Sequence, residues 1–269
     1  MRGESLLGKK TGYPMTYSPD LLRSIPRADS RRVIGLTSEL PFQGEDVWNA
    51  YELTWLNVKG KPQVATAEFR VPAASPSIIE SKSMKLYLNS LSMTRYGEAD
   101  AVAQTIVTDL SRAAGAAVSV ELYSLAETGG ILDLPGTCID ELDVECSSAG
   151  VDPGLLGPGR GDTVSEALHS HILRTLCPVT GQPDSASILI RYQGRRLDRG
   201  ALLRYLASYR NHADFHESCV ERVFLDIQDR CKPERLTVYA RYNRRGGLDI
   251  NPFRSDFESG ADNVRLRRQ

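Results

Sequence analysis

The chain has 269 residues, enough for one large domain or for two small domains that each bury a core. Its 33 Lys and Arg balance 34 Asp and Glu, which excludes both a polycation that binds nucleic acid without specificity and an acidic disordered chain. The five cysteines include no CxxC pair, which argues against a disulfide scaffold and against a zinc ribbon.

The first residues, 1–40, are expected to form an arm that packs on the module that follows it. Their start contains no apolar stretch of the about 7–15 residues that a secretory signal peptide needs. No other segment approaches the ~20 apolar residues of a membrane span. We therefore expect a cytoplasmic protein that does not contact a membrane.

After the arm, the hydrophobic pattern predicts two strands, two helices and a third strand, in that order. The first two strands are expected within 47–57 and 64–71. The helices are expected near 83–91 and 99–113, and the next strand within 118–126.

Residues 146–162 are rich in glycine, proline and serine, which is typical of a linker. Their GxGxG run does not predict dinucleotide binding, because no strand precedes it and the third glycine is misplaced. The following segment, 163–176, is ambiguous. Thr163 and Glu166 resemble the capping box of a helix, whereas the position in the repeat described next requires a strand. We predict a strand.

Beyond this segment, a strand is predicted in 187–192, helices in 199–209 and 217–231, and a strand in 236–242. Four landmarks of this half repeat those of the first half in the same order, with an offset of about 117–121 residues. The matched pairs are Gly60–Phe69 with Gly181–Ile190, Tyr87–Ser90 with Tyr205–Ser208, Ile106–Leu110 with Val223–Ile227, and Val118–Tyr123 with Leu236–Tyr242. Chance similarity between two α+β domains is the competing explanation. We predict a duplicated α+β fold with modules at 41–145 and 163–269.

The two copies differ where chemistry is expected. The turn at Cys177, followed seven residues later by Asp184, has neither residue in the aligned turn of the first copy. A thiol and a carboxyl group so placed could act as nucleophile and proton donor, although a cysteine without a chemical role is an equally good interpretation. Conversely, the first copy enters its first helix with Glu80, Lys82 and Lys85, which the second copy lacks.

The other cysteines give weaker signals. Cys219 and Cys231 lie on the predicted helix 217–231 and are expected in the core, and Cys138 and Cys146 have no sequence partners that suggest chemistry.

Two further motifs carry polar groups. His212, His216 and Cys219 could be metal ligands, but their spacing matches no strong zinc pattern. The pair His216–Glu217 suits a guanine-like N–H edge better, because a carboxylate accepts two parallel hydrogen bonds; a carboxylate that interacts with the helix dipole is the plain alternative. The segment Arg241–Gly247 combines arginines that bind phosphate with glycines that allow close approach, although a solvated charged turn would look the same.

These motifs together resemble one family. Glu80-Ser-Lys-Ser-Met-Lys-Leu-Tyr87 fits the signature of the nitrile reductases that make 7-aminomethyl-7-deazaguanine for the tRNA nucleoside queuosine. The turn Cys177–Asp184, the element Phe215–Glu217 and the segment Tyr242–Pro252 also resemble that family. The resemblance covers nearly the whole chain and is to the long, two-module form.

The resemblance implies a tandem tunnelling fold (T-fold) and a homodimeric, NADPH-dependent, metal-free reductase of 7-cyano-7-deazaguanine. It implies that Cys177 forms a covalent thioimide and that Asp184 is the general acid. Implied substrate-binding residues are Ile79, Glu80, Ser81, His216 and Glu217; implied NADPH contacts are Ser81, Lys82, Arg245 and Gly246. The first module would then serve cofactor and substrate, the second would carry the catalytic pair, and no nucleic acid would bind directly. The alternatives are a zinc-dependent GTP-cyclohydrolase-like enzyme of the same fold and a non-catalytic purine- or RNA-binding module.

Overall fold

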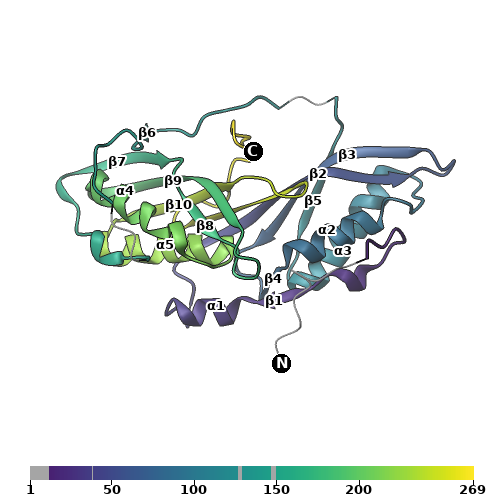
Figure 1. Ribbon diagram of the computed structural model, residues 1–269, viewed down its shortest axis with the longest axis horizontal. Helices are drawn as coiled ribbons and strands as arrows, with labels where there is room; N and C mark the ends of the chain where they lie inside the picture. Colours follow the sequence, from purple (N-terminus) through teal and green to yellow (C-terminus); the bar gives the residue numbers. More distant parts are fainter. Residues whose placement is uncertain (1–11, 38, 127–128, 147–149) are drawn as a thin grey trace. The chain divides into compact units, whose positions relative to one another are not determined.

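A computed structural model of the chain describes residues 12–37, 39–126, 129–146 and 150–269 (Figure 1). The chain divides into two compact units. The first unit takes the described parts of 1–38 and 46–130 together with 244–250, and the second takes 39–45, 251–269 and the described part of 131–243. Each unit is described separately below.

The N-terminal arm packs within the first unit. It forms the 3-10 helix η1 (Pro19–Leu21), strand β1 (Ser24–Pro26) and helix α1 (Arg27–Val33). Strand β1 pairs antiparallel with β4 (Ser77–Ile79), with Ser24 opposite Ile79. The hydroxyl group of Tyr17 donates a hydrogen bond of 2.7 Å to the Asp109 carboxylate.

The sheet of the first unit follows the order β5 (Ser119–Tyr123), β3 (Pro62–Pro72), β2 (Gln43–Leu56), and helices α2 (Ser81–Ser90) and α3 (Ala99–Ala114) lie along it (Figure 1). Alternate residues of β3 are buried, as expected for a strand with one face on a core. Residues four apart on α3 are buried in the same core. These buried residues are Ala65, Ala67, Phe69 and Val71 on β3, and Val102, Ile106, Leu110 and Ala114 on α3.

The second unit contains the second part of β11 (Leu248–Ser255), from residue 251 on. The strands that follow it in the sheet are β10 (Arg235–Tyr242), β9 (Pro183–Arg196), β7 (Arg160–Ser170) and β6 (Thr137–Cys138), with β8 (Arg174–Leu176) also pairing with β9. Its helices are η2 (Pro153–Leu155), α4 (Arg199–Ala207), η3 (Ser208–Asn211) and α5 (His216–Cys231). Helix α5 packs against β10 with one face that buries Val220, Val223, Phe224 and Ile227.

The predicted helices and strands of both copies are found, and the ambiguous segment 163–176 is indeed extended. It forms β7 and β8, which pair antiparallel with β9. Glu166 does not close a capping box, because its carboxylate instead accepts a 2.6 Å hydrogen bond from the hydroxyl group of Tyr192 across the strand pair. Of the predicted linker, residues 147–149 lie outside the described residues.

The structure is mixed α+β with mainly antiparallel strand pairs, as predicted; β6 and β7 form a short parallel pair. Within the described residues, no helix has the length and apolar character that crossing a membrane would require.

Candidate active site

The hairpin of β8 and β9 holds Cys177 and Asp184 in the second unit. Thr175 lies opposite Asp184 in the register of the two strands. The N–H of Cys177 donates to the carbonyl of Gln182, and the N–H of Gly181 donates to the carbonyl of Cys177, both at 2.9 Å. Because paired residues share a face of a sheet, Thr175 lies on the face that carries Asp184, and Cys177 follows β8 directly. Cys177 and Asp184 are buried, with exposed fractions of 6% and 8%.

The start of helix α5 is attached to the same hairpin by backbone hydrogen bonds. The N–H of Leu176 donates to the carbonyl of His212 at 2.8 Å, and the N–H of Asp214 donates to the carbonyl of Leu176 at 3.2 Å. The first residue of the helix, His216, consequently places its Nε2 atom 3.3 Å from Oδ2 of Asp184. Glu217, the next residue, is also buried. The structure thus brings Cys177, Asp184, His216 and Glu217 to one hairpin–helix junction of the second unit, whereas Arg245 and Gly246, also predicted in module 163–269, pack in the first unit.

Tyr242 is a member of this junction to which the sequence analysis gave no role. Its ring lies parallel to the His216 imidazole, with centroids 3.6 Å apart and 3° between the planes. Burial, with the nearby Cys219 thiol and Asp184 carboxyl, raises the pKa of the Tyr242 hydroxyl well above its usual value. Tyr242 therefore stays neutral and fixes the plane of the imidazole. It is the last residue of β10. The hydrophobic pattern of the sequence could not have identified it, because the pattern marks it only as one more buried aromatic residue.

The buried cysteines of α5 have no features of nucleophiles. Burial raises the pKa of the Cys219 thiol well above its usual value and that of Cys231 to about 11. Both are in the core, as predicted. Among the described residues, the groupings of three potential metal ligands do not include His212, His216 and Cys219.

Glu80 is the most unusual carboxylate of the first unit. It follows Ile79 at the end of β4 and is the N-cap residue of α2, yet its side chain caps no backbone N–H. Its exposed fraction is 2%, and neither carboxylate oxygen has a hydrogen-bond partner among the described residues. Burial raises the pKa of Glu80, against the opposing effect of the cations Lys82 and Arg23. Such a group is poised for a ligand that donates hydrogen bonds.

The backbone of Glu80, unlike its carboxylate, makes several hydrogen bonds. Its N–H donates to the carbonyl of Arg23, and its carbonyl accepts from the N–H of Met84 and from the hydroxyl group of Ser83, at 2.9, 3.0 and 2.7 Å. Ser81 and Lys82 follow as the first two residues of α2.

A turn with two consecutive glycines gathers cations beside α2. Gly246 and Gly247 have φ values of 60° and 78°, which favour glycine. A Cβ atom on Gly246 would lie 2.9 Å from Nζ of Lys85, so this ammonium lies directly over the glycine backbone. Arg245, whose N–H donates to the carbonyl of Leu248 at 2.7 Å, precedes the glycines. Lys82 lies one helical turn before Lys85, on the same side of α2. The predicted cofactor residues, Ser81, Lys82, Arg245 and Gly246, thus all lie in the first unit and combine two cations with an exposed glycine.

Comparison with known proteins identifies the relatives of this chain. Residues 13–122 match the family model described as "Nitrile reductase, 7-cyano-7-deazaguanine-reductase N-term", and residues 183–260 match the one described as "QueF-like protein". The chain is 52% identical to the NADPH-dependent 7-cyano-7-deazaguanine reductase of Burkholderia multivorans, with 98% of each chain covered. It is 53% identical to the protein of the same name from Dechloromonas aromatica, with 98% of this chain and 95% of the relative covered.

Among solved structures, a crystal structure of the archaeosine synthase QueF-Like in the apo form covers 38% of this chain, with a TM-score of 0.31 and 16% identity. We draw no argument from this likeness.

Proposed function

The chain belongs to the nitrile reductase family of NADPH-dependent 7-cyano-7-deazaguanine reductases, and from this premise we propose how its residues perform the reaction. It is an oxidoreductase that uses NADPH to reduce the nitrile of 7-cyano-7-deazaguanine to the aminomethyl group, as a step of queuosine biosynthesis. The observation that carries the mechanistic proposal is the contact between His216 and Asp184 on the hairpin that also carries Cys177.

The reaction begins, in our proposal, with a covalent step. The sulfur of Cys177 adds to the nitrile carbon while Asp184, as general acid, gives a proton to the nitrile nitrogen, and the product is a thioimide. A nitrile is a poor hydride acceptor, so this addition divides one difficult step into easier ones. His216, 3.3 Å from the Asp184 carboxyl group, orients the proton donor. The burial of the pair keeps water from the intermediates.

When bound, NADPH would supply the hydrides for the two reductions that follow, of the thioimide and then of the imine that is left once the Cys177 sulfur departs. The residues present in the first unit suit such a cofactor. Ser81, Lys82, Arg245 and Gly246 are proposed to hold it, because cations bind phosphate groups and Gly246 leaves its backbone accessible. Lys85, whose ammonium lies over Gly246, adds a third side-chain cation.

Substrate recognition is proposed to rest on two buried glutamates. Glu217 accepts hydrogen bonds from the N–H edge of the deazaguanine, and the imidazole of His216 lies beside it at the start of α5. Glu80 is proposed as a further carboxylate for this edge, with Ile79 and Ser81 as its neighbours. Its two oxygens without hydrogen-bond partners among the described residues support this role, since a ligand that donates N–H groups would satisfy them.

The order of helices and strands supports a tandem T-fold, for which we keep modules at 41–145 and 163–269, although residues 131–145 pack in the second unit and 244–250 in the first. The first unit contains strands, two helices and a strand as β2, β3, α2, α3 and β5, and the second repeats this order as β7, β9, α4, α5 and β10. The residues 1–40 are proposed as an arm of the first module and 146–162 as the linker.

We also propose a homodimer in the cytoplasm. All five cysteines are among the described residues and none forms a disulfide, which is usual in a reducing compartment. Size-exclusion chromatography with light scattering tests the dimer: a mass near 29.7 kDa, that of one chain, would contradict it.

The covalent step is tested by mass spectrometry after the protein is mixed with 7-cyano-7-deazaguanine without NADPH. We expect a mass increase of one substrate molecule in the wild type and in Cys146→Ser, whose exposed thiol is the matched control. Cys177→Ala is expected to form no adduct and to oxidise no NADPH. An adduct that persists in Cys177→Ala would refute the nucleophile. Substrate binding without any NADPH oxidation by the wild type would instead favour a non-catalytic purine-binding module.

A further inference from the structure

Three potential metal ligands gather in the second unit outside the proposed active-site residues. Cys138, His169 and His171 offer ligand atoms that all lie within 4.8 Å of one another. Cys138 is exposed on β6, while His169 is buried near the end of β7 and His171 follows that strand. A thiolate with two imidazoles is the ligand type that zinc and related transition metals prefer.

The backbone fixes this arrangement. Strand β6 lies parallel to β7 with Cys138 opposite His169, and the N–H of Ile139 donates to the carbonyl of His169 at 3.0 Å. The two imidazole rings lie 5.2 Å apart in an edge-to-face orientation. At Gly136 a Cβ atom would lie 2.1 Å from the carbonyl oxygen of Ala167, so only glycine allows the chain to approach β7 this closely.

Asp140, two residues after Cys138, also holds this segment against β7. Asp140 accepts a hydrogen bond of 2.6 Å from the hydroxyl group of Ser170 and one of 2.9 Å from the N–H of His171. Cys138 is therefore held beside the two histidines by contacts on both sides of it in the sequence.

The Nδ1 atom of each histidine takes part in a hydrogen bond. Nδ1 of His169 lies 3.1 Å from the carbonyl oxygen of Pro135; because a carbonyl only accepts, this nitrogen carries the proton and Nε2 carries the lone pair. Nδ1 of His171 lies 2.7 Å from the hydroxyl oxygen of Ser187. Ligand histidines in metal sites typically make such an outer hydrogen bond, which fixes the ring and its tautomer.

We propose that Cys138 Sγ and the Nε2 atoms of His169 and His171 bind one zinc ion, with a fourth position open to water. Zinc bonds of roughly 2.0–2.3 Å put tetrahedral ligand atoms about 3.3–3.8 Å apart, so ligand atoms that now lie within 4.8 Å of one another must approach by up to about 1.5 Å. The exposed thiol of Cys138 can approach the histidines by a change of rotamer, and the two imidazoles approach each other by small changes in their own side-chain torsions. The ion fastens β6 to β7 and takes no part in the nitrile reduction.

The test is a titration of the full chain, without an affinity tag, with Co²⁺ and then Zn²⁺. We expect one equivalent of Co²⁺ to give a thiolate-to-cobalt charge-transfer band and tetrahedral d–d bands, and Zn²⁺ to displace it. Cys138→Ser is expected to lose the charge-transfer band and to bind Zn²⁺ at least about 100-fold more weakly, since loss of even an outer-shell partner costs about 10–100-fold. The matched control is Cys146→Ser, the other exposed cysteine.

A second variant tests the outer hydrogen bond. Ser187→Ala removes the partner of His171 without removing a ligand and is expected to weaken Zn²⁺ binding by about 10–100-fold. The proposal is overturned if the wild type gives no thiolate band, or if Cys146→Ser loses the band as Cys138→Ser does. NADPH oxidation with the nitrile substrate is expected to be unchanged in Cys138→Ser, so a failure of the metal site is distinguishable from a failure of the proposed function.

Discussion

Substitution of Glu80 by glutamine is expected to stabilise the protein while it weakens substrate binding. The buried carboxylate of Glu80 has no hydrogen-bond partner among the described residues, and an unsatisfied buried polar group costs about 1–3 kcal/mol, more when it is charged. Glutamine keeps the shape and removes the charge. The amide would still lack hydrogen-bond partners, so only the extra cost of the charge is removed. At neutral pH we therefore expect Glu80→Gln to raise the free energy of unfolding by about 1 kcal/mol, which is about 2–4 °C in Tm.

The stability gained by Glu80→Gln is expected at neutral pH and is expected to disappear as the pH falls. Burial raises the pKa of Glu80 in the folded chain above its ordinary value of 4.5, so over the interval between the two values the folded chain binds more protons than the unfolded chain. The free energy of unfolding of the wild type consequently falls as the pH rises through this interval. Near or below 4.5 the carboxyl group is protonated in both states, and the advantage of Glu80→Gln disappears.

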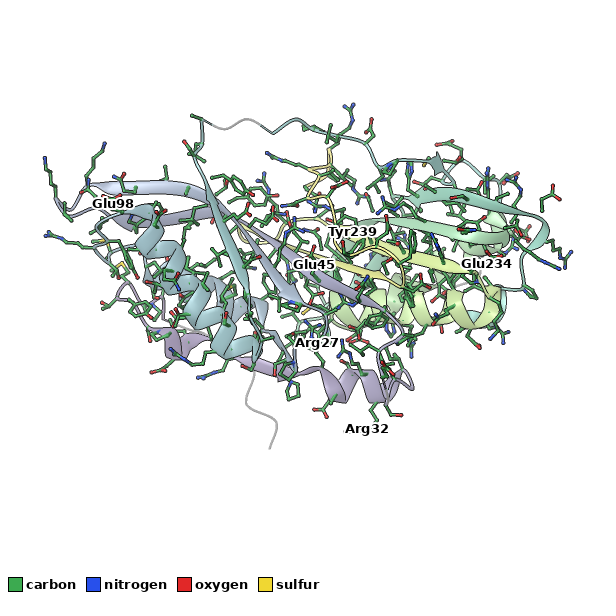
Figure 2. The ribbon with its side chains drawn as sticks, turned by 180° about the vertical axis from the view of Figure 1, so that it is seen from behind. Arg27, Arg32, Glu45, Glu98, Glu234 and Tyr239 are labelled. Carbon is green, nitrogen blue, oxygen red and sulfur yellow. The ribbon has the colours of Figure 1, made fainter. Side chains whose placement is uncertain are left out.

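The assay is thermal or urea unfolding followed by tryptophan fluorescence at several pH values. Both tryptophans, Trp48 and Trp55, are buried in β2 of the first unit, so the signal reports on the unit that contains Glu80. Glu98→Gln is the matched control, because Glu98 is also an N-cap glutamate without a capping hydrogen bond but is exposed at the start of α3 (Figure 2). A stability difference for Glu80→Gln that does not change with pH, or that matches the control, would refute the reasoning.

Glu80→Gln is expected to change stability and substrate binding in opposite directions. Hydrogen bonds to a charged group contribute about 1.5–3 kcal/mol, so loss of the carboxylate is expected to raise the Kd of 7-cyano-7-deazaguanine by about 10–100-fold. A more stable variant that binds substrate more weakly is the expected behaviour of a residue retained for function.

Three further outcomes are expected. Arg27→Ala should lower the free energy of unfolding by about 3–5 kcal/mol, because the buried carboxylate of Asp46 loses the guanidinium that lies 2.6 Å away. Arg32 on the same helix is exposed and pairs with the exposed Asp29 (Figure 2), so the control Arg32→Ala should change this free energy by less than about 0.5 kcal/mol. Gly246→Ala should raise the KM for NADPH about tenfold, because a side chain at this positive φ costs about 1–2 kcal/mol and the new Cβ atom would meet the ammonium group of Lys85. The control is Gly97→Ala, since no atom lies near the Cβ position of Gly97. Tyr242→Leu should lower kcat/KM by about 10–100-fold by freeing the stacked imidazole, while Tyr242→Phe, which keeps the ring, should retain activity.

Most helices and strands could be predicted because their burial follows local periods. Helix α3 buries residues four apart and β3 buries alternate residues, and both patterns are visible in the sequence. The segment 163–176 shows the limit of this approach. Its apolar residues fit a helix, but Leu168 pairs with Ile190 on β9, so a partner distant in sequence decides its conformation.

The candidate site could be predicted only as a set of residues. The difference between the two copies selected Cys177 and Asp184, but not the stacking of Tyr242 on His216. The cluster at Cys138 was also out of reach, because a strand of two residues with a parallel partner leaves no periodic pattern. Contacts of this kind are set by strand register over long sequence separations, which local patterns do not encode.

The predicted repeat finally suggests an internal comparison that supports Glu80 as a functional candidate. Asp198 begins the corresponding helix of the second copy, α4, and its shorter side chain accepts a hydrogen bond of 2.9 Å from the N–H of Ala201, as an N-cap should. Glu80 occupies the same place before α2, is buried, and caps nothing. Helix stability alone would favour aspartate at both positions. Since one copy has the capping residue and the other a longer carboxylate that goes without a partner, the difference is best explained by a ligand that Glu80 binds and Asp198 does not.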